Sequence, residues 1–123
     1  MDEWEIRVTN EIRDWIQALD VGSRLQVVHA VDRLAEAGPG LGRPLVDKLE
    51  GSRVHSLKEL RPGSAGRSEI RILFVFDPWR SAVLLIGGDK SGEWSGWYRR
   101  AVPRAEELYE EYLKEREAEE KDR

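Results

Sequence analysis

The sequence predicts an α+β protein, with a small antiparallel sheet packed with an N-terminal helix pair and a C-terminal helix in the order β-α-α-β-β-β-α. Three observations predict this class. Apolar and charged residues alternate near the N-terminus, helical spacing follows from Ile12 onward, and strand-like runs return between residues 54 and 86. A further helical pattern lies near the C-terminus, so both helices and strands contribute to the core.

The first two elements are a strand and a helix. Apolar and charged side chains alternate over residues 4–8, which predicts a short strand at or near a sheet edge. The next apolar residues follow the i, i+3, i+4, i+7 spacing of an amphipathic helix: Ile12, Trp15, Ile16 and Leu19. Asn10 or Thr9 would cap this helix, and residues 20–22 would end it.

A second helix is expected to follow directly. Ser23 and Gln26 match a capping box, in which each side chain satisfies a free amide at the start of a helix. The helix should run to about Ala37. Gly38 and Pro39 would stop it, because glycine accepts the left-handed conformation and proline cannot continue the hydrogen-bond ladder.

Three strands are expected in the middle of the chain, over residues 54–60, 69–76 and 82–86. Residues 77–80 read Asp-Pro-Trp-Arg, which is typical of a tight turn, so the last two strands should form a hairpin. The even-numbered residues of 69–76 are all large and apolar and would face a core. Arg71 would then project from the opposite face of a central strand.

The C-terminal pattern predicts a helix beginning near Pro103, since proline suits the first turn of a helix. Beyond Lys114 the only apolar residue is Ala118. We therefore expect a single domain over residues 1–123 that ends in an acidic, frayed and solvated extension from about residue 114. The alternative is that this extension lies over a basic surface and masks it.

Charge is distributed unevenly along the chain. Residues 43–104 contain twelve Lys and Arg against seven Asp and Glu, whereas the whole chain carries a net charge of −4. A basic middle segment between acidic flanks indicates a site for a polyanion, which the overall charge conceals.

Composition narrows the function classes. The chain has no cysteine and two histidines far apart in the sequence, so we expect no metal site and no cofactor. The longest apolar run, residues 82–86, is too short to cross a bilayer, and no charged-then-apolar leader opens the chain. We expect a soluble, cytoplasmic protein.

A cluster of cations can cleave RNA without a metal, because the nucleophile is the 2′-hydroxyl of the substrate itself. Arginine binds phosphate oxygens bidentately, and lysine with a lowered pKa can transfer protons. Glu59 could serve as the base with Tyr98 as the proton donor, or Lys58 could serve as the base with Lys90 or Arg61 as the acid. The simpler alternative is that the arginines pair with nearby carboxylates on a solvated face and that His55 is structural.

Three fragments, residues 57–61 (LKELR), 69–74 (EIRILF) and 87–90 (GGDK), together resemble the RelE/ParE toxin superfamily. The nearest branch is the phage-derived HigB-like toxins of type II toxin-antitoxin systems, and the resemblance covers roughly residues 48–113. It implies a RelE-like fold and a metal-independent endoribonuclease that cuts mRNA in the ribosomal A site. It also implies neutralisation by a cognate helix-turn-helix antitoxin.

The resemblance places the motif cations on Arg61, Arg71 and Lys90. Together with Lys58, these are the expected catalytic residues. The expected RNA-binding residues are Lys48, Trp94, Trp97, Tyr98, Arg99 and Arg100. Many relatives have His-Gly-Phe and paired lysines where this chain has residues 87–90, so the aromatic residues 94, 97 and 98 would supply the stacking surface instead.

Two other functions fit the same resemblance. One is a ParE-like inhibitor of DNA gyrase that cleaves no RNA. The other is a catalytically silent module that only binds an antitoxin or regulates.

Overall fold

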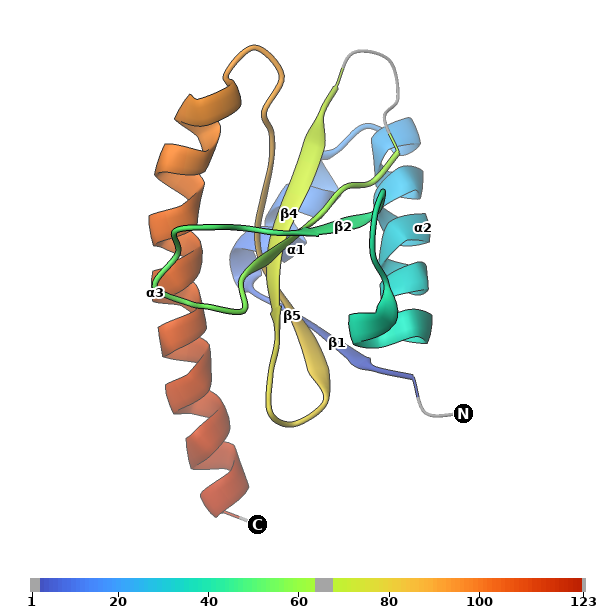
Figure 1. Cartoon of the computed structure of the whole chain (residues 1–123). Helices are drawn as coiled ribbons and strands as arrows, with labels where there is room; N and C mark the ends of the chain where they lie inside the picture. The colour runs from blue at the N-terminus through green and yellow to red at the C-terminus, as the bar shows by residue number, and fades with distance from the viewer. Residues whose placement is uncertain (1–2, 64–67, 123) are drawn as a thin grey trace.

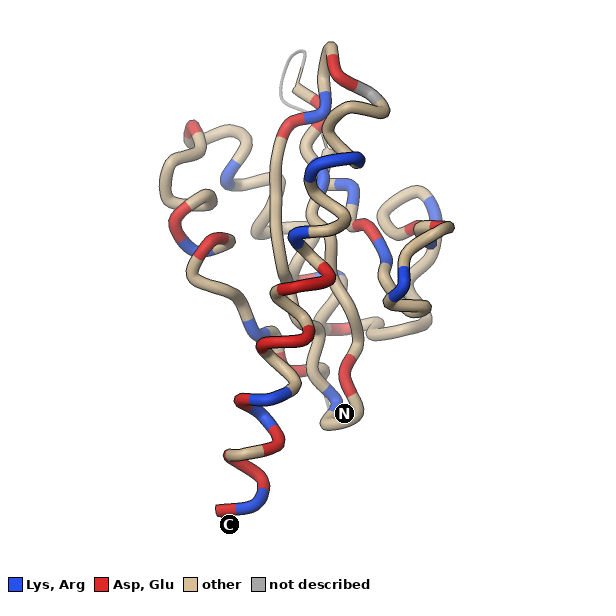
Figure 2. The backbone as a smooth tube through the Cα atoms, turned by 90° about the vertical axis from the view of Figure 1, so that its left-hand side faces the viewer, with Lys and Arg blue, Asp and Glu red and all other residues tan. Residues whose placement is uncertain are grey.

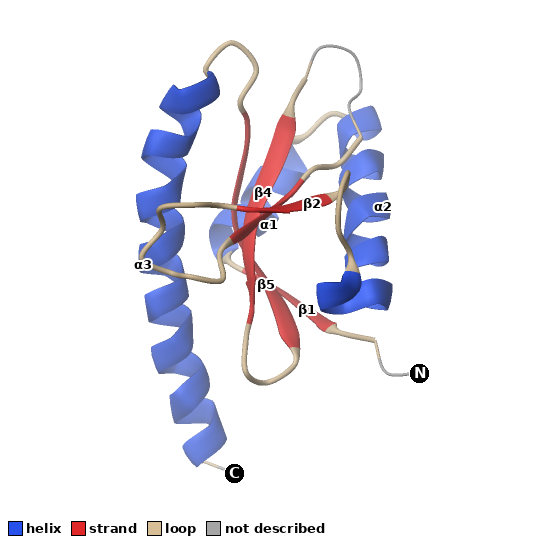
Figure 3. Ribbon diagram, viewed as in Figure 1, coloured by secondary structure: helices blue, strands red, loops and turns tan. Residues whose placement is uncertain are grey.

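The computed structural model describes residues 3–63 and 68–122, which form one mixed sheet with helices on both faces (Figure 1). Its elements are β1 (Glu5–Val8), α1 (Asn10–Ala18), α2 (Val21–Ala37), a 3-10 turn (Gly38–Gly40), β2 (Val46–Lys48), β3 (Lys58–Leu60), β4 (Ile70–Phe76), β5 (Ser81–Asp89) and α3 (Trp94–Lys121). The strand order is β1-β5-β4-β3-β2. Helices α1 and α2 cover one face and α3 covers the other (Figure 3).

Each face of the sheet has its own core. Even-numbered residues of β4, such as Ile72 and Phe74, pack with α1 and α2, whereas Leu73 and Val75 pack against α3. Burial on both faces explains why β4 reads as an almost continuous apolar run rather than an alternating one. Arg71 lies on the α3 face, as predicted, because it alternates with the residues that face α1 and α2.

The predicted α+β class is confirmed, and three details of the sheet differ. The sheet contains β2, a three-residue strand that the sequence analysis missed because its pattern is too short to show a period. The sheet is also not wholly antiparallel, since β1 pairs in parallel with β5 at the edge. The strand predicted over residues 54–60 shortens to β3, and the preceding residues form a loop that reaches α3 (Figure 1).

The first two helix starts are set by caps, of which the first is confirmed and the second differs from the prediction. Thr9 caps α1 by accepting the backbone N–H of Ile12 at 3.1 Å. Asp20, not Ser23, caps α2, and its carboxylate accepts the N–H of Ser23 at 3.1 Å. The capping-box prediction was therefore three residues late, because Ser23 occupies the third helical position and is buried.

Helix α3 begins at Trp94, nine residues before the predicted start, and Pro103 lies inside it. The residues beyond 114 are helical as far as Lys121, and Figure 2 shows acidic and basic positions alternating along them. Arg116 is 6% exposed, with its guanidinium 5.3 Å from the ring of Trp79, so this part of the helix contacts the β4–β5 hairpin. Within the described residues, the apolar stretches of the helices are too short to cross a membrane.

Candidate nucleic-acid site

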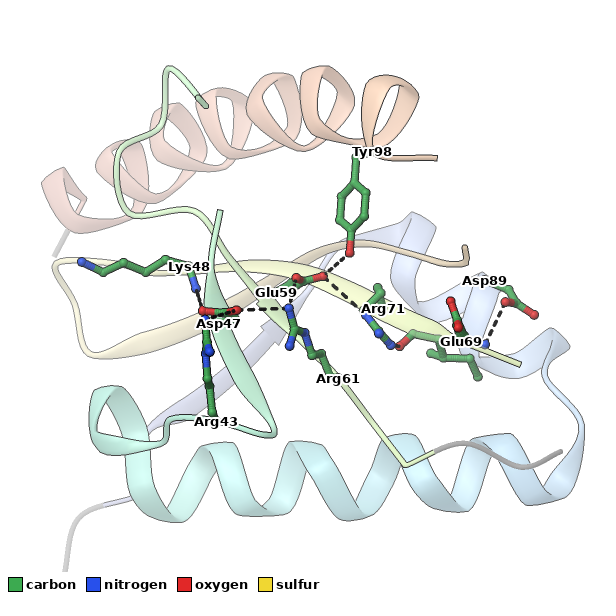
Figure 4. A network of polar contacts seen from close by, with 10 residues as sticks. Arg43, Asp47, Lys48, Glu59, Arg61, Glu69, Arg71, Asp89 and Tyr98 are labelled. Carbon is green, nitrogen blue, oxygen red and sulfur yellow. Dashed lines mark hydrogen bonds and ion pairs between the residues drawn. The ribbon is translucent and has the colours of Figure 1, made fainter. Parts of the chain in front are cut away.

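The face of β3 and β4 that is turned toward α3 carries a group of polar side chains (Figure 4). Glu59 and Arg61 come from β3 and the residue after it, Arg71 comes from β4, and Tyr98 comes from the start of α3. Lys90 follows the end of β5. The sheet register thus brings together residues that are up to 39 positions apart in the chain.

Glu59 lies at the centre of this group and is 3% exposed. Its carboxylate accepts a hydrogen bond from the Tyr98 hydroxyl at 2.6 Å and from Arg61 Nη2 at 2.9 Å. Arg71 Nε lies 3.5 Å from the same carboxylate. A buried carboxylate with these neighbours orients all three groups, because moving any of them leaves its charge uncompensated.

Arg61 bridges two carboxylates, since its Nη2 also lies 3.1 Å from Asp47 Oδ2. The hydrogen bond with Glu59 raises the pKa of Arg61 above its ordinary value, against the opposing effect of burial. Arg43 lies 3.2 Å from the same oxygen of Asp47. Partial burial would raise the pKa of Asp47, but the Lys48 amide and the two arginines together lower it.

The two arginines are not fully paired. Arg71 is largely buried, and its Nη1 donates to the Ile70 carbonyl at 2.8 Å. The Nε atoms of Arg61 and Arg71 are buried and have no hydrogen-bond partner among the described residues. An unsatisfied buried guanidinium N–H is costly, so both guanidinium groups would gain from an additional acceptor.

Lys90 is 4% exposed, and the turn that holds it is built by Asp89. The Asp89 carboxylate accepts the backbone N–H groups of Glu69 and Ser91, each at 2.9 Å. Burial and the nearby charge of Arg71 lower the pKa of Lys90, with smaller effects from neighbouring charges. Lys90 Nζ lies 5.5 Å from the ring centroid of Tyr98, which joins this lysine to the Glu59 group.

Tyr98 contacts both the Glu59 carboxylate and the Lys90 side chain. Burial and its hydrogen bond to Glu59 raise the pKa of Tyr98 to about 12. The phenol is therefore neutral near pH 7, and its O–H donates a hydrogen bond to Glu59. Its oxygen lone pairs remain available to accept a second hydrogen bond.

Three predicted catalytic residues come together and one does not. Arg61 and Arg71 share the Glu59 carboxylate and Lys90 lies beside Tyr98, so the three cations are not scattered over separate surfaces. Lys58 lies on the other face of the sheet, 5.4 Å from the ring of Phe76. The alternation of side chains along β3 separates Lys58 from Glu59 and Arg61, so Lys58 does not reach this group.

The predicted RNA-binding residues are also divided. Trp97 is 8% exposed and packs against Gly88 and Leu85 rather than facing solvent, which does not fit a base-stacking role. Lys48, Arg99 and Arg100 are exposed, and Arg100 pairs with Glu93 at 2.9 Å. The side chain of Trp94 lies outside the described residues.

Gly87 and Gly88 are explained by packing rather than by a turn. Both lie within β5 without a left-handed backbone, and a Cβ atom would collide with Trp15 at Gly87 and with Trp97 at Gly88. The sequence analysis gave these glycines no packing role. It also missed Asp47 and Asp89, and no pattern in the sequence identifies either carboxylate as a partner of the cationic group.

Comparisons with known proteins identify the family. The sequence profile described as "Phage derived protein Gp49-like" matches residues 14–110. The solved structure of a mutant of the E. coli toxin RelE in the free state has a TM-score of 0.61 at 16% identity, covering 83% of this chain and 97% of that one. The chain therefore has a RelE-like fold. It belongs to the Gp49-like family of phage-derived, HigB-like proteins.

Two curated relatives from Mycobacterium tuberculosis carry toxin names. "Putative toxin HigB2" is 49% identical over 102 residues, which are 83% of this chain and 51% of that protein. "Putative toxin HigB3" is 48% identical over 103 residues, which are 84% of this chain and 88% of that protein. The chain thus spans about half the length of the first relative and most of the second.

Proposed function

We propose that this protein is the toxin of a type II toxin-antitoxin system and a ribosome-dependent mRNA endonuclease that works without a metal. The observation that supports this most directly is the convergence of Arg61, Arg71 and Lys90 around the buried Glu59–Tyr98 pair. Two guanidinium groups whose Nε atoms make no hydrogen bond, one buried ammonium and one oriented phenol match the requirements of 2′-hydroxyl attack on a phosphodiester.

The arginines bind the scissile phosphate in this proposal. Their buried Nε atoms donate to its non-bridging oxygens, whose negative charge grows as the pentavalent transition state forms. Arg61 turns from Glu59 toward the phosphate. Glu59 then faces less positive charge and becomes a better proton acceptor.

Tyr98 and Glu59 remove the 2′-hydroxyl proton. That hydroxyl donates to the Tyr98 oxygen while Tyr98 passes its own proton to Glu59 across the 2.6 Å hydrogen bond. The 2′-oxygen bonds to phosphorus, and the bond from phosphorus to the 5′-oxygen breaks. Lys90 gives a proton to the leaving 5′-oxygen, and its lowered pKa makes it a stronger acid than an ordinary lysine.

Two partners follow from this proposal. The ribosome presents the mRNA, and an antitoxin neutralises the free toxin, as the family resemblance implies. Because the chain spans about half the length of one toxin-named relative, its activity and partners are proposed for this chain rather than carried over.

The test is cleavage of mRNA during translation in a reconstituted system, with cut sites mapped by primer extension. Wild-type protein should give cuts in phase with codons, and Arg71→Ala should cleave at least roughly 100-fold more slowly, as when one donor to a developing oxyanion is removed. Arg33→Ala is the matched control, because Arg33 is an exposed arginine on α2. Circular dichroism should show that both variants are folded.

An Arg71→Ala protein that cut translated mRNA as well as the parent would overturn the proposal. In cells that produce the protein without an antitoxin, intact transcripts together with an induced DNA-damage response would instead support the gyrase-inhibitor alternative. An absence of toxicity at high expression would support a silent module.

A further inference from the structure

Lysines 48 and 58, which the catalytic group leaves unused, form a pair on the other face of the β2–β3 hairpin. They are direct register partners, and their side chains therefore project from the same face at neighbouring positions. The preceding pair, Asp47 and Glu59, projects from the face that carries the catalytic group. Figure 4 shows the Lys48 side chain directed away from Arg61 and Tyr98.

This lysine pair has no counter-charge in the part of the chain that the structure describes. No carboxylate lies within ion-pair distance of either ammonium group, whereas the nearby cations Arg43 and Arg61 both pair with Asp47. Like charges that lie directly opposite each other destabilise a strand pair. The arrangement thus places two uncompensated positive charges at one position on the sheet.

A surface hollow lies beside the pair. It measures about 290 Å³ and is bounded by β2, by β3 and by the glycine-rich segment from Pro39 to Arg43. Lys48 and Lys58 line it, as do Arg43 and Asp47, which pair with each other at 3.2 Å. Lys58 is half-buried and is held against the Phe76 ring, so one ammonium has a fixed position while Lys48 is exposed.

The hollow is bounded by β2 at one edge of the sheet, and the proposed catalytic site lies on the opposite face. β2 is the outermost strand, so no further strand separates the two faces there. Lys58 and Arg61 are three residues apart along β3, which corresponds to about 10 Å of extended chain. A single nucleic-acid strand that passes around β2 would meet both positions.

We propose that Lys48, Lys58 and Arg43 form a second phosphate subsite, which binds the backbone of the RNA strand whose scissile phosphate lies at Arg61 and Arg71. This inference rests on the proposed function. It assigns Lys48 and Lys58 to binding rather than chemistry, because they contact phosphate without reaching the reacting atoms. Such contacts set affinity and position and carry little base preference.

The test measures binding rather than cleavage, with a labelled single-stranded oligonucleotide that contains 2′-deoxyribose throughout and cannot react through a 2′-hydroxyl. Affinity is measured by fluorescence anisotropy between 50 and 200 mM salt for the parent and for K48A/K58A. Loss of two phosphate contacts should weaken binding roughly tenfold at 0.1 M salt and reduce the slope of log affinity against log salt by about 1.4. The matched control is K114A/K121A, which removes two exposed lysines from the far half of α3 and should change neither quantity.

The variant should fold normally, because it removes a like-charged pair. Thermal unfolding checks this, and a K48Q/K58Q protein provides a second version that retains more of the side-chain length. Binding by K48A/K58A equal to that of the parent would overturn the subsite, as would failure of the parent to bind the oligonucleotide at all. Loss of affinity for a polyglutamate peptide but not for the oligonucleotide would also overturn it, in favour of an acidic protein partner.

Arg71→Ala separates this inference from the proposed function. If K48A/K58A loses affinity and Arg71→Ala still cleaves mRNA like the parent, the subsite stands and the catalytic proposal fails. If Arg71→Ala loses cleavage while K48A/K58A binds normally, the catalytic proposal stands and the subsite fails.

Discussion

Glu59→Gln is the most informative single substitution, because it removes one buried negative charge and keeps the shape of the side chain. The wild-type carboxylate contacts Tyr98 at 2.6 Å, Arg61 at 2.9 Å and Arg71 at 3.5 Å. Breaking a buried ion pair by removing one partner costs about 3 to 5 kcal/mol. Glutamine retains one acceptor, and Arg61 retains Asp47, so we expect a loss of about 2 to 3 kcal/mol in the free energy of unfolding.

Thermal and urea unfolding measure this loss, and for a chain of this length it corresponds to a melting temperature lower by roughly 10 °C. Asp47→Asn is the control. Asp47 is more exposed than Glu59 and pairs with Arg43 and Arg61, so its substitution should cost less than half as much.

The same substitution has a spectroscopic consequence at Tyr98. Folding raises the pKa of this phenol from 10.0 to about 12, so the stability that Tyr98 contributes is full below pH 10 and is lost as the pH rises toward 12. Ultraviolet titration of the parent minus Tyr98→Phe isolates this transition from those of the other tyrosines. In Glu59→Gln its midpoint should move down toward 10, because the hydrogen bond to a charged acceptor and the negative charge are gone.

An unchanged Tyr98 midpoint in a folded Glu59→Gln protein would refute the account of Glu59 as the group that orients Tyr98. A stability equal to that of the parent would refute its role in holding the arginines.

Two further predictions concern the packing that supports the site. Gly88→Ala should lower the free energy of unfolding by about 1 to 3 kcal/mol and change the tryptophan fluorescence, because the new methyl group would collide with Trp97. Gly42→Ala is the control and should be nearly neutral, because a methyl group there meets open space. Equal unfolding free energies for the two variants would contradict this packing. Glu106→Ala should increase the rate of proteolysis in the loop of residues 49–57, because Glu106 accepts hydrogen bonds from Ser52 and Arg53 at 2.8 to 3.0 Å. Replacement of the exposed Glu107 should leave the cleavage rate unchanged, and equal rates in both variants would show that Glu106 does not hold the loop.

Much of the fold follows from local patterns. The edge strand, the two N-terminal helices and the β4–β5 hairpin were predicted because each has its own period, cap or turn residues, which act over a few neighbouring positions. The errors lie where local signals are weak or misleading. β2 is three residues long, and Pro103 resembles a helix start although it lies inside α3.

The candidate site likewise has features that the sequence predicts and features that only the folded structure creates. The amino-acid order alone was enough to indicate a basic middle segment and the side of β4 from which Arg71 projects, because charge and strand alternation are properties of the chain. The family resemblance added the three motif cations. Only the folded molecule places Lys58 behind the sheet, buries Trp97 against Gly88 and gives Arg61 and Tyr98 a shared carboxylate. Those outcomes depend on strand register and on how α3 packs, which join residues dozens of positions apart and leave no periodic trace in the sequence.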